Sequence, residues 1–451
     1  MKSVKEIIGI DKAIAYSSGA RIVQGIAGAV SVIIISAFLS GVEQGFYFTF
    51  GSIVALQVFF ELGLTGIITQ YVAHEASHLT LNGKAEYEGD DQYKSRLASL
   101  IHFCVKWYAV LALLVFLFLL LVGFVYFSNY GSEHDSVSWE IPWILICVGT
   151  ALKLFQSPFN SIYMGVGKVK EMSEIGFWQQ MIVPVSTWLG LAFGFKLYVI
   201  GISYLLSVIL WQLYIHYSRL DHIVLNLWKD KITYRVNYIK EIFPFQWRIA
   251  ISWISGYFIF QLFTPVLFAT DGAVVAGQMG LTMTVIGAIQ SLSLSWINTK
   301  VPVFSEKIAL KKYLELDKLF NKSMIQMTSI TSILFLLLFI SLLFLDYFQL
   351  TINDSGLLRE RFLPFFPLFL MIFSASLNNI VSGWATYLRC HKKEPLLVFS
   401  VVCGIACCLS TMIFGNLYGL HGITIGYFAI IFVTTPWVYS IFRKKKKQWH
   451  I

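Results

Sequence analysis

Long apolar runs separated by shorter polar segments make up most of the chain. Runs such as 108–127, 323–345 and 396–414 each hold about 20 residues, the length that an α-helix needs to cross a bilayer core. Twelve runs of this kind predict an all-α polytopic membrane protein. They cover residues 13–39, 45–72, 107–127, 140–163, 174–195, 197–217, 244–269, 273–298, 323–345, 363–388, 395–415 and 422–442.

Composition agrees with this interpretation. Hydrophobic residues make up 57% of the chain and charged residues 13%, whereas about a quarter of an ordinary soluble domain is charged. The net charge of +9 could suggest a nucleic-acid partner. However, the basic residues are dispersed among apolar runs, and no basic stripe with interleaved aromatic residues is found. We therefore expect no nucleic-acid binding.

The distribution of basic residues predicts the orientation in the membrane. Of the 34 Lys and Arg residues, 28 lie in segments on the side of the termini, 3 lie in connections on the other side, and 3 lie within spans. Basic residues accumulate on the cytoplasmic side of membrane proteins. Both termini are therefore predicted to be cytoplasmic, including the run from Arg443 to Lys447.

The spans are predicted to form two lobes of six helices around a central cavity. The predicted lobes are residues 1–217 and 244–442, joined by a cytoplasmic linker at 218–243 and followed by a basic tail at 443–451. A faint internal repeat supports this division. Each half opens with a span that carries an early arginine, and a short outer turn then leads to a glycine, Gly45 or Gly277. Transporters are often built from two such repeats, with the substrate site between them.

Four charged residues inside the spans are the strongest candidates for function: Arg21, Glu61, Lys153 and Arg248. A charge at the centre of a membrane helix costs about 2.5–3.5 kcal/mol on insertion scales, so it is expected to face protein or a wet cavity. Helical spacing gives each of them polar neighbours on the same face. These neighbours include Gln24 for Arg21, Gln57 for Glu61, and Ser157 and Asn160 for Lys153.

The four charges differ in their predicted depth in the membrane. Counted at 1.5 Å per residue from the cytoplasmic ends, Arg21, Glu61 and Lys153 lie roughly 12–16 Å deep, and Arg248 about 6 Å deep. Three cations against one carboxylate predict a positive cavity that binds an anionic substrate. The alternative is that Arg21 and Lys153 form structural ion pairs with Glu61. Glu61 is itself either such a counter-ion or a proton carrier.

Nothing in the sequence predicts an enzyme, a cofactor or a metal site. A phosphate-binding loop around Gly167 and Lys168 would need a glycine five residues earlier and a Ser or Thr after the lysine, but these positions hold Ile162 and Val169. The histidines are scattered, and the six cysteines lie mostly in apolar spans, where cysteine acts as a small hydrophobic residue. Pro158 and Pro184 lie deep in their spans. Each is either a hinge or a static kink.

Several segments resemble a known family. They are FYFTFG at 46–51, LQVFFELG at 56–63, AGQMG at 276–280, KVP at 300–302 and LRCHKKEP at 388–395. In this order and relative to the spans, they resemble the multidrug/oligosaccharidyl-lipid/polysaccharide exporter superfamily, and within it the Wzx-type O-antigen flippases. The resemblance covers about residues 10 to 440.

The resemblance implies a flippase that works by alternating access. Its substrate would be an undecaprenyl-pyrophosphate-linked oligosaccharide, moved from the cytoplasmic to the periplasmic leaflet of a bacterial inner membrane. A polysaccharide polymerase is an implied partner. Related flippases carry arginines in the first helices of their lobes, where Arg21 and Arg248 lie, whereas Lys153 matches no motif of the family.

Two other functions fit the sequence less well than a flippase does. An ion-coupled multidrug or small-molecule exporter would accept organic cations, for which Arg21 and Lys153 have the wrong sign. A membrane polysaccharide polymerase or ligase would need a large outer loop, and the outer loops here are short.

Overall fold

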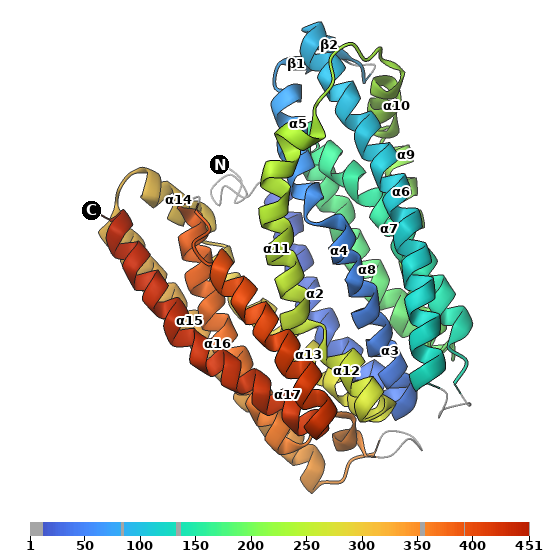
Figure 1. Cartoon of the computed structure of the whole chain (residues 1–451), viewed down its shortest axis with the longest axis vertical. Helices are drawn as coiled ribbons and strands as arrows, with labels where there is room; N and C mark the ends of the chain where they lie inside the picture. The colour runs from blue at the N-terminus through green and yellow to red at the C-terminus, as the bar shows by residue number, and fades with distance from the viewer. Residues whose placement is uncertain (1–11, 83–84, 132–136, 352–356, 392, 451) are drawn as a thin grey trace, which may run out of the picture. The chain divides into compact units, whose positions relative to one another are not determined.

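The computed structural model describes residues 12–82, 85–131, 137–351, 357–391 and 393–450, apart from some side chains in the helices. The chain divides into two compact units (Figure 1). The first unit holds residues 1–23 and 53–254, and the second holds residues 24–52 and 255–451. The predicted lobe boundaries at 217 and 244 remain a prediction.

Helices make up almost all of both units. Helix α2 (Lys12–Phe38) begins in the first unit and ends in the second. The other elements of the first unit are η1 (Ala55–Gln57), α4 (Val58–Glu61), α5 (Leu64–Ala76), β1 (Leu79–Leu81), β2 (Tyr87–Gly89), α6 (Asp91–Tyr130), α7 (Glu140–Gly165), α8 (Val169–Ala192), α9 (Tyr198–Tyr217), α10 (Asp221–Lys229) and the π-helical turn η3 (Tyr238–Ile242), together with most of α11 (Phe243–Phe260).

The second unit contains α3 and the helices that follow α11. They are α3 (Gly41–Val54), α12 (Phe263–Thr270), α13 (Ala273–Asn298), α14 (Val301–Ala309), α15 (Tyr313–Tyr347), the short 3-10 turn η4 (Leu358–Arg361), α16 (Phe365–Cys390) and α17 (Leu397–Trp449). Helices α15, α16 and α17 lie side by side in Figure 1.

The prediction of a polytopic all-α membrane protein is confirmed. In the described part of the chain, seven helices are long and apolar enough to cross a membrane, and nine if each of two bent helix pairs counts as one span. All twelve predicted spans fall on helices. The three that this count leaves out correspond to α2, to α8 and to the second half of α17.

Helix α17 holds two predicted spans, and it consists of two helices that are joined by a sharp kink at Gly419. Gly419 has φ 54° and ψ −136°, a conformation that favours glycine. The Asp271 carboxylate lies where a Cβ on Gly419 would be, and its Oδ2 accepts a hydrogen bond of 2.6 Å from the Leu420 amide. Asp271 therefore satisfies a donor at the start of the second half of the helix.

The predicted linker at 218–243 is held against the first unit. In Figure 1, α10 and the hairpin of β1 and β2 lie at the end of the unit where α6 begins. The Ser95 hydroxyl on α6 accepts hydrogen bonds from the amides of Thr233 and Tyr234, at 2.7 and 2.8 Å. These bonds fasten the extended segment between α10 and η3 to α6.

An ion-pair network fastens the end of the same linker. The Arg96 guanidinium donates to the Glu75 carboxylate at 3.0 Å and to the Glu241 carboxylate at 2.7 Å. Only 2% of the Glu75 side chain is exposed, so Arg96 compensates a buried charge. The network joins α5, α6 and η3.

In the second unit, α3 and α13 cross with their backbones in close contact. A Cβ on Gly45 would lie 2.0 Å from the Ala273 carbonyl oxygen, and a Cβ on Gly277 would lie 2.8 Å from the Gly45 amide nitrogen. The Gln44 side chain donates to the carbonyls of Gly277 and Arg361, at 2.8 and 3.2 Å. The two glycines of the predicted repeat thus meet at one helix crossing.

Candidate functional site

The second predicted span is broken in the middle, directly after Glu61. Leu62 and Gly63 both have left-handed backbone conformations, with φ of 52° and 67°. The two parts of the span are bent by 43° at this point. A left-handed leucine costs roughly 1–2 kcal/mol, and discontinuous helices at membrane depth often border transport sites. The break is therefore a candidate functional feature.

Glu61 is the last residue of α4, and its side chain is partly buried at the break. Its carboxylate accepts a hydrogen bond of 2.9 Å from the Thr65 hydroxyl on α5. Tyr108 on α6 lies close enough to Glu61 to interact electrostatically. Among the residues that the structure describes, no cation pairs with Glu61. Among the described residues, the carboxylate is therefore held by the Thr65 hydroxyl rather than by an ion pair.

Lys153 lies in the middle of α7 and points towards α9. Its Nζ lies 4.3 Å from the centre of the Tyr204 ring, a cation–π contact. No acidic side chain in the described ranges forms an ion pair with Lys153. A structural pair with Glu61 is therefore not formed in this structure. The charge of Lys153 is partly buried and has no anionic partner among the described residues.

The polar neighbours predicted for Lys153 lie on α7, and the one predicted for Glu61 lies in η1. Asn160 accepts a hydrogen bond of 2.6 Å from Trp211 of α9, while the Ser157 hydroxyl donates to the Leu154 carbonyl of its own helix at 2.9 Å. Gln57, in η1, is partly buried. The face shared by Lys153 and Asn160 is thus directed at α9.

The other predicted cations cannot be placed at side-chain level. The backbones of Arg21 and Arg248 lie in α2 and α11, but their side chains lie outside the described residues. Gln24 is exposed and belongs to the second unit, whereas Lys153 and Glu61 belong to the first. A cationic cavity that includes Arg21, Lys153 and Arg248 therefore remains a prediction.

The described side chains also limit what the site can do chemically. In the described ranges no group of three or more His, Cys, Asp or Glu residues could hold a metal ion.

The features that the sequence did not reveal are the break at Leu62 and the Tyr204 ring. Gly63 within an apolar run was the available signal for the break, whereas nothing in the sequence paired Tyr204 with Lys153.

The structure resembles solved membrane transporters over almost its whole length. One is a multidrug resistance MATE family transporter of the MOP superfamily in an inward-facing conformation, with 13% identity, 97% of this chain and 99% of that chain covered, and a TM-score of 0.64. Another is the lipid II flippase MurJ in an inward closed conformation, with 12% identity, coverage of 94% and 86%, and a TM-score of 0.61. A third is the MATE multidrug transporter DinF-BH, solved as a complex, with 14% identity, coverage of 98% and 96%, and a TM-score of 0.55.

These identities show the fold alone, and that fold is shared by multi-pass transporters of the MOP superfamily. The family follows from a second comparison. The model of the family described as polysaccharide biosynthesis protein matches residues 10–307, so the chain belongs to that family. A comparison with curated proteins gives no match. The chain is therefore a membrane transporter or flippase of a polysaccharide biosynthesis family.

Proposed function

We propose that the chain is a flippase for an undecaprenyl-pyrophosphate-linked oligosaccharide, the repeat unit of an O-antigen or a similar polysaccharide. It would carry this substrate from the cytoplasmic to the periplasmic leaflet of a bacterial inner membrane by alternating access, with both of its own termini in the cytoplasm. Membership of the polysaccharide biosynthesis family supports the substrate class. A polysaccharide polymerase is the proposed partner that takes over the product.

The observation that carries the proposal is the charge of Lys153, which has no ion-pair partner in the described part of the chain. A pyrophosphate linker bears about two negative charges, and an unpaired charge in a low-dielectric layer is very costly. Lys153 lies roughly 15 Å from the cytoplasmic end of its span, at 1.5 Å per residue. Its partner in this structure is the Tyr204 ring, which carries no negative charge that would neutralise the ammonium group. A lysine serves there as a mobile point charge.

The test is translocation of a fluorescent lipid-linked oligosaccharide in proteoliposomes. We expect Lys153→Ala to lower the initial rate at least about tenfold, because one ion contact to the linker is worth about 1.5–3 kcal/mol. Lys153→Arg keeps the charge and is expected to retain part of the rate. The matched control is Lys106→Ala, which removes the same charge from an exposed position on α6.

Thermal unfolding separates a transport defect from a folding defect. Lys153→Ala should unfold at or above the temperature of the wild type, because it removes a partly buried charge that has no ion-pair partner among the described residues. A normal rate in Lys153→Ala would refute the role of this residue. No translocation by the wild-type protein would refute the flippase assignment itself.

A second function, ion-coupled export of small organic cations, is favoured by one observation. The Glu61 carboxylate lies at a helix break and has no cationic partner among the described residues. Such a group could bind an organic cation or carry a coupling proton. Efflux of a cationic dye from energised vesicles that is lost in Glu61→Gln would favour the exporter. Translocation of the lipid-linked sugar by the same variant would favour the flippase.

A further inference from the structure

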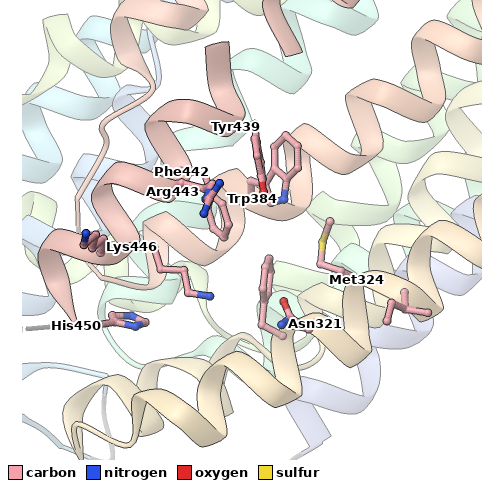
Figure 2. A pocket seen from close by; sticks show the side chains of 11 residues that line it. Asn321, Met324, Trp384, Tyr439, Phe442, Arg443, Lys446 and His450 are labelled. Carbon is pink, nitrogen blue, oxygen red and sulfur yellow. The ribbon is translucent and has the colours of Figure 1, made fainter. Parts of the chain in front are cut away.

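A pocket of about 640 Å³ lies in the second unit, between α15, α16 and α17, whereas the helix break after Glu61 belongs to the first unit. Its volume is in the range of pockets that bind small ligands. Figure 2 shows the labelled side chains Trp384, Tyr439 and Phe442 on one side, with Arg443 and Lys446 further along α17 and His450 directly after it. The pocket is therefore apolar on its walls and basic towards the end of α17.

The basic residues of the pocket occupy one face of α17. Arg443, Lys446, Lys447 and His450 are spaced i, i+3, i+4 and i+7, which places them on one side of a helix. Lys444 and Lys445 belong to the same basic run but do not line the pocket. Three of the five cations in the run therefore share a cavity rather than spreading evenly into solvent.

The charges in this pocket are only partly compensated. Lys446 forms an ion pair with Asp317 at 3.0 Å. Arg443 and Lys447 have no acidic partner in the part of the chain that the structure describes, and both are exposed. Within the described ranges, no acidic residue lines the pocket. The pocket thus presents two uncompensated cations to a ligand.

The pocket continues onto a surface suited to acyl chains. Ile325 lines it and is 67% exposed, and Ile333 and Leu336 continue the exposed apolar face of α15 at 57% and 59%. Trp384 and Tyr439 also line the pocket, and such aromatic residues are common at membrane interfaces. One ligand could therefore contact both an apolar helix face and a basic pocket.

We infer that this pocket binds the phosphate headgroup of an acidic phospholipid of the cytoplasmic leaflet, with an acyl chain along α15. Basic pockets between membrane helices on the cytoplasmic side are general binding sites for anionic headgroups. The leaflet follows from the predicted orientation of α17. The pocket belongs to the second unit, whereas Lys153 and Glu61 belong to the first, and the inference does not depend on the proposed substrate.

The probe is phosphatidylglycerol, added to the purified full-length chain in non-ionic detergent and counted by native mass spectrometry. Each Lys or Arg near an anionic headgroup contributes about a fivefold gain in affinity. We therefore expect Arg443→Gln with Lys447→Gln to weaken phosphatidylglycerol binding roughly 30-fold. The wild-type protein should bind phosphatidylglycerol at least about tenfold more tightly than phosphatidylcholine.

The matched control is Lys444→Gln with Lys445→Gln, which removes the same charge from the same run outside the pocket. We expect its affinity to stay within about threefold of the wild type, because neither residue lines the pocket. An equal loss in both double variants would show diffuse attraction to the basic run and would overturn the assignment. Equal binding of the two lipids by the wild type would do the same.

Two further arms keep the result unambiguous. Inorganic phosphate at millimolar concentration should not displace the lipid, and full displacement would show a phosphate site without a lipid. All variants should unfold at the wild-type temperature in lipid-free detergent, since the mutated side chains lie on the surface or at the pocket rim. If the double variant fails to fold, Lys447→Gln alone should still weaken binding about fivefold, and unchanged affinity in that variant would refute the inference.

Discussion

Replacing Gly45 by alanine tests the crossing of α3 and α13. The added Cβ would lie 2.0 Å from the Ala273 carbonyl oxygen, so the two helices would have to separate by more than 1 Å to reach an ordinary contact of roughly 3.4 Å. Overpacking of this kind costs about 1–3 kcal/mol. Separation would also lengthen the two hydrogen bonds that Gln44 donates across the crossing, each worth about 1 kcal/mol.

The expected loss is about 3 kcal/mol, because alanine returns about 1 kcal/mol through its higher helix propensity. For a unit of this size, the melting temperature should fall by roughly 6–12 °C. The measurement is thermal unfolding of the purified chain in detergent, followed by tryptophan fluorescence. Gly51→Ala in the same helix is the matched control, since a Cβ on Gly51 would meet nothing within 4 Å.

The two substitutions are expected to act in opposite directions. Gly51→Ala adds helix propensity without a clash and should leave the melting temperature unchanged or raise it. If Gly45→Ala melts at the same temperature as Gly51→Ala, the close crossing of α3 and α13 contributes nothing measurable. The short distance between the Ala273 carbonyl and Gly45 would then not constrain the two helices.

Three further predictions concern the linker and the orientation. Arg96→Gln should destabilise the chain by about 3 kcal/mol, because it removes the arginine that compensates the buried Glu75 carboxylate. The control Arg235→Gln, at an exposed position in the linker, should not lower the melting temperature. Although burial raises the pKa of Glu241, the Asn237 amide and the Arg96 guanidinium hold it below its usual 4.5. This stability is present above pH 4.5 and is lost as the pH falls through the lowered pKa, so Glu241→Gln should flatten the acid limb of melting temperature against pH. A cysteine at Lys447 should react with membrane-impermeant reagents only from the cytoplasmic side, and labelling from outside would reverse the orientation.

The spans were predictable because length and apolar character alone decide whether a helix can cross a bilayer. The sequence predicts spans ending at 415 and beginning at 422, and the kink that separates the two helices of α17 lies between them, at Gly419. The position of Asp271, far away in the chain, decides how that kink is stabilised. A tertiary contact of this kind has no local signature.

The candidate site was predictable as a helix face but not as an environment. Helical spacing predicts Lys153 and Asn160 on one face of α7, and both contact α9. Which residue they meet depends on how α7 packs against α9, and this cannot be read from one sequence. The break after Glu61 was missed because Leu62 is an ordinary residue for a continuous helix. Its left-handed conformation is imposed by the surroundings.

The faint repeat in the sequence gains a physical meaning from the α3–α13 crossing. Corresponding positions of the two predicted halves are six spans apart. Because six is an even number, corresponding helices cross the membrane in the same direction. Gly45 and Gly277 each follow a short turn at the same predicted side of the membrane, so they lie at similar depth and can meet. A Cβ on Gly277 would lie 2.8 Å from the Gly45 amide nitrogen, and the Gln44 side chain donates to the Gly277 carbonyl. The glycine of each half therefore provides the space that the other half needs, which is why neither position could take a larger residue without moving both helices.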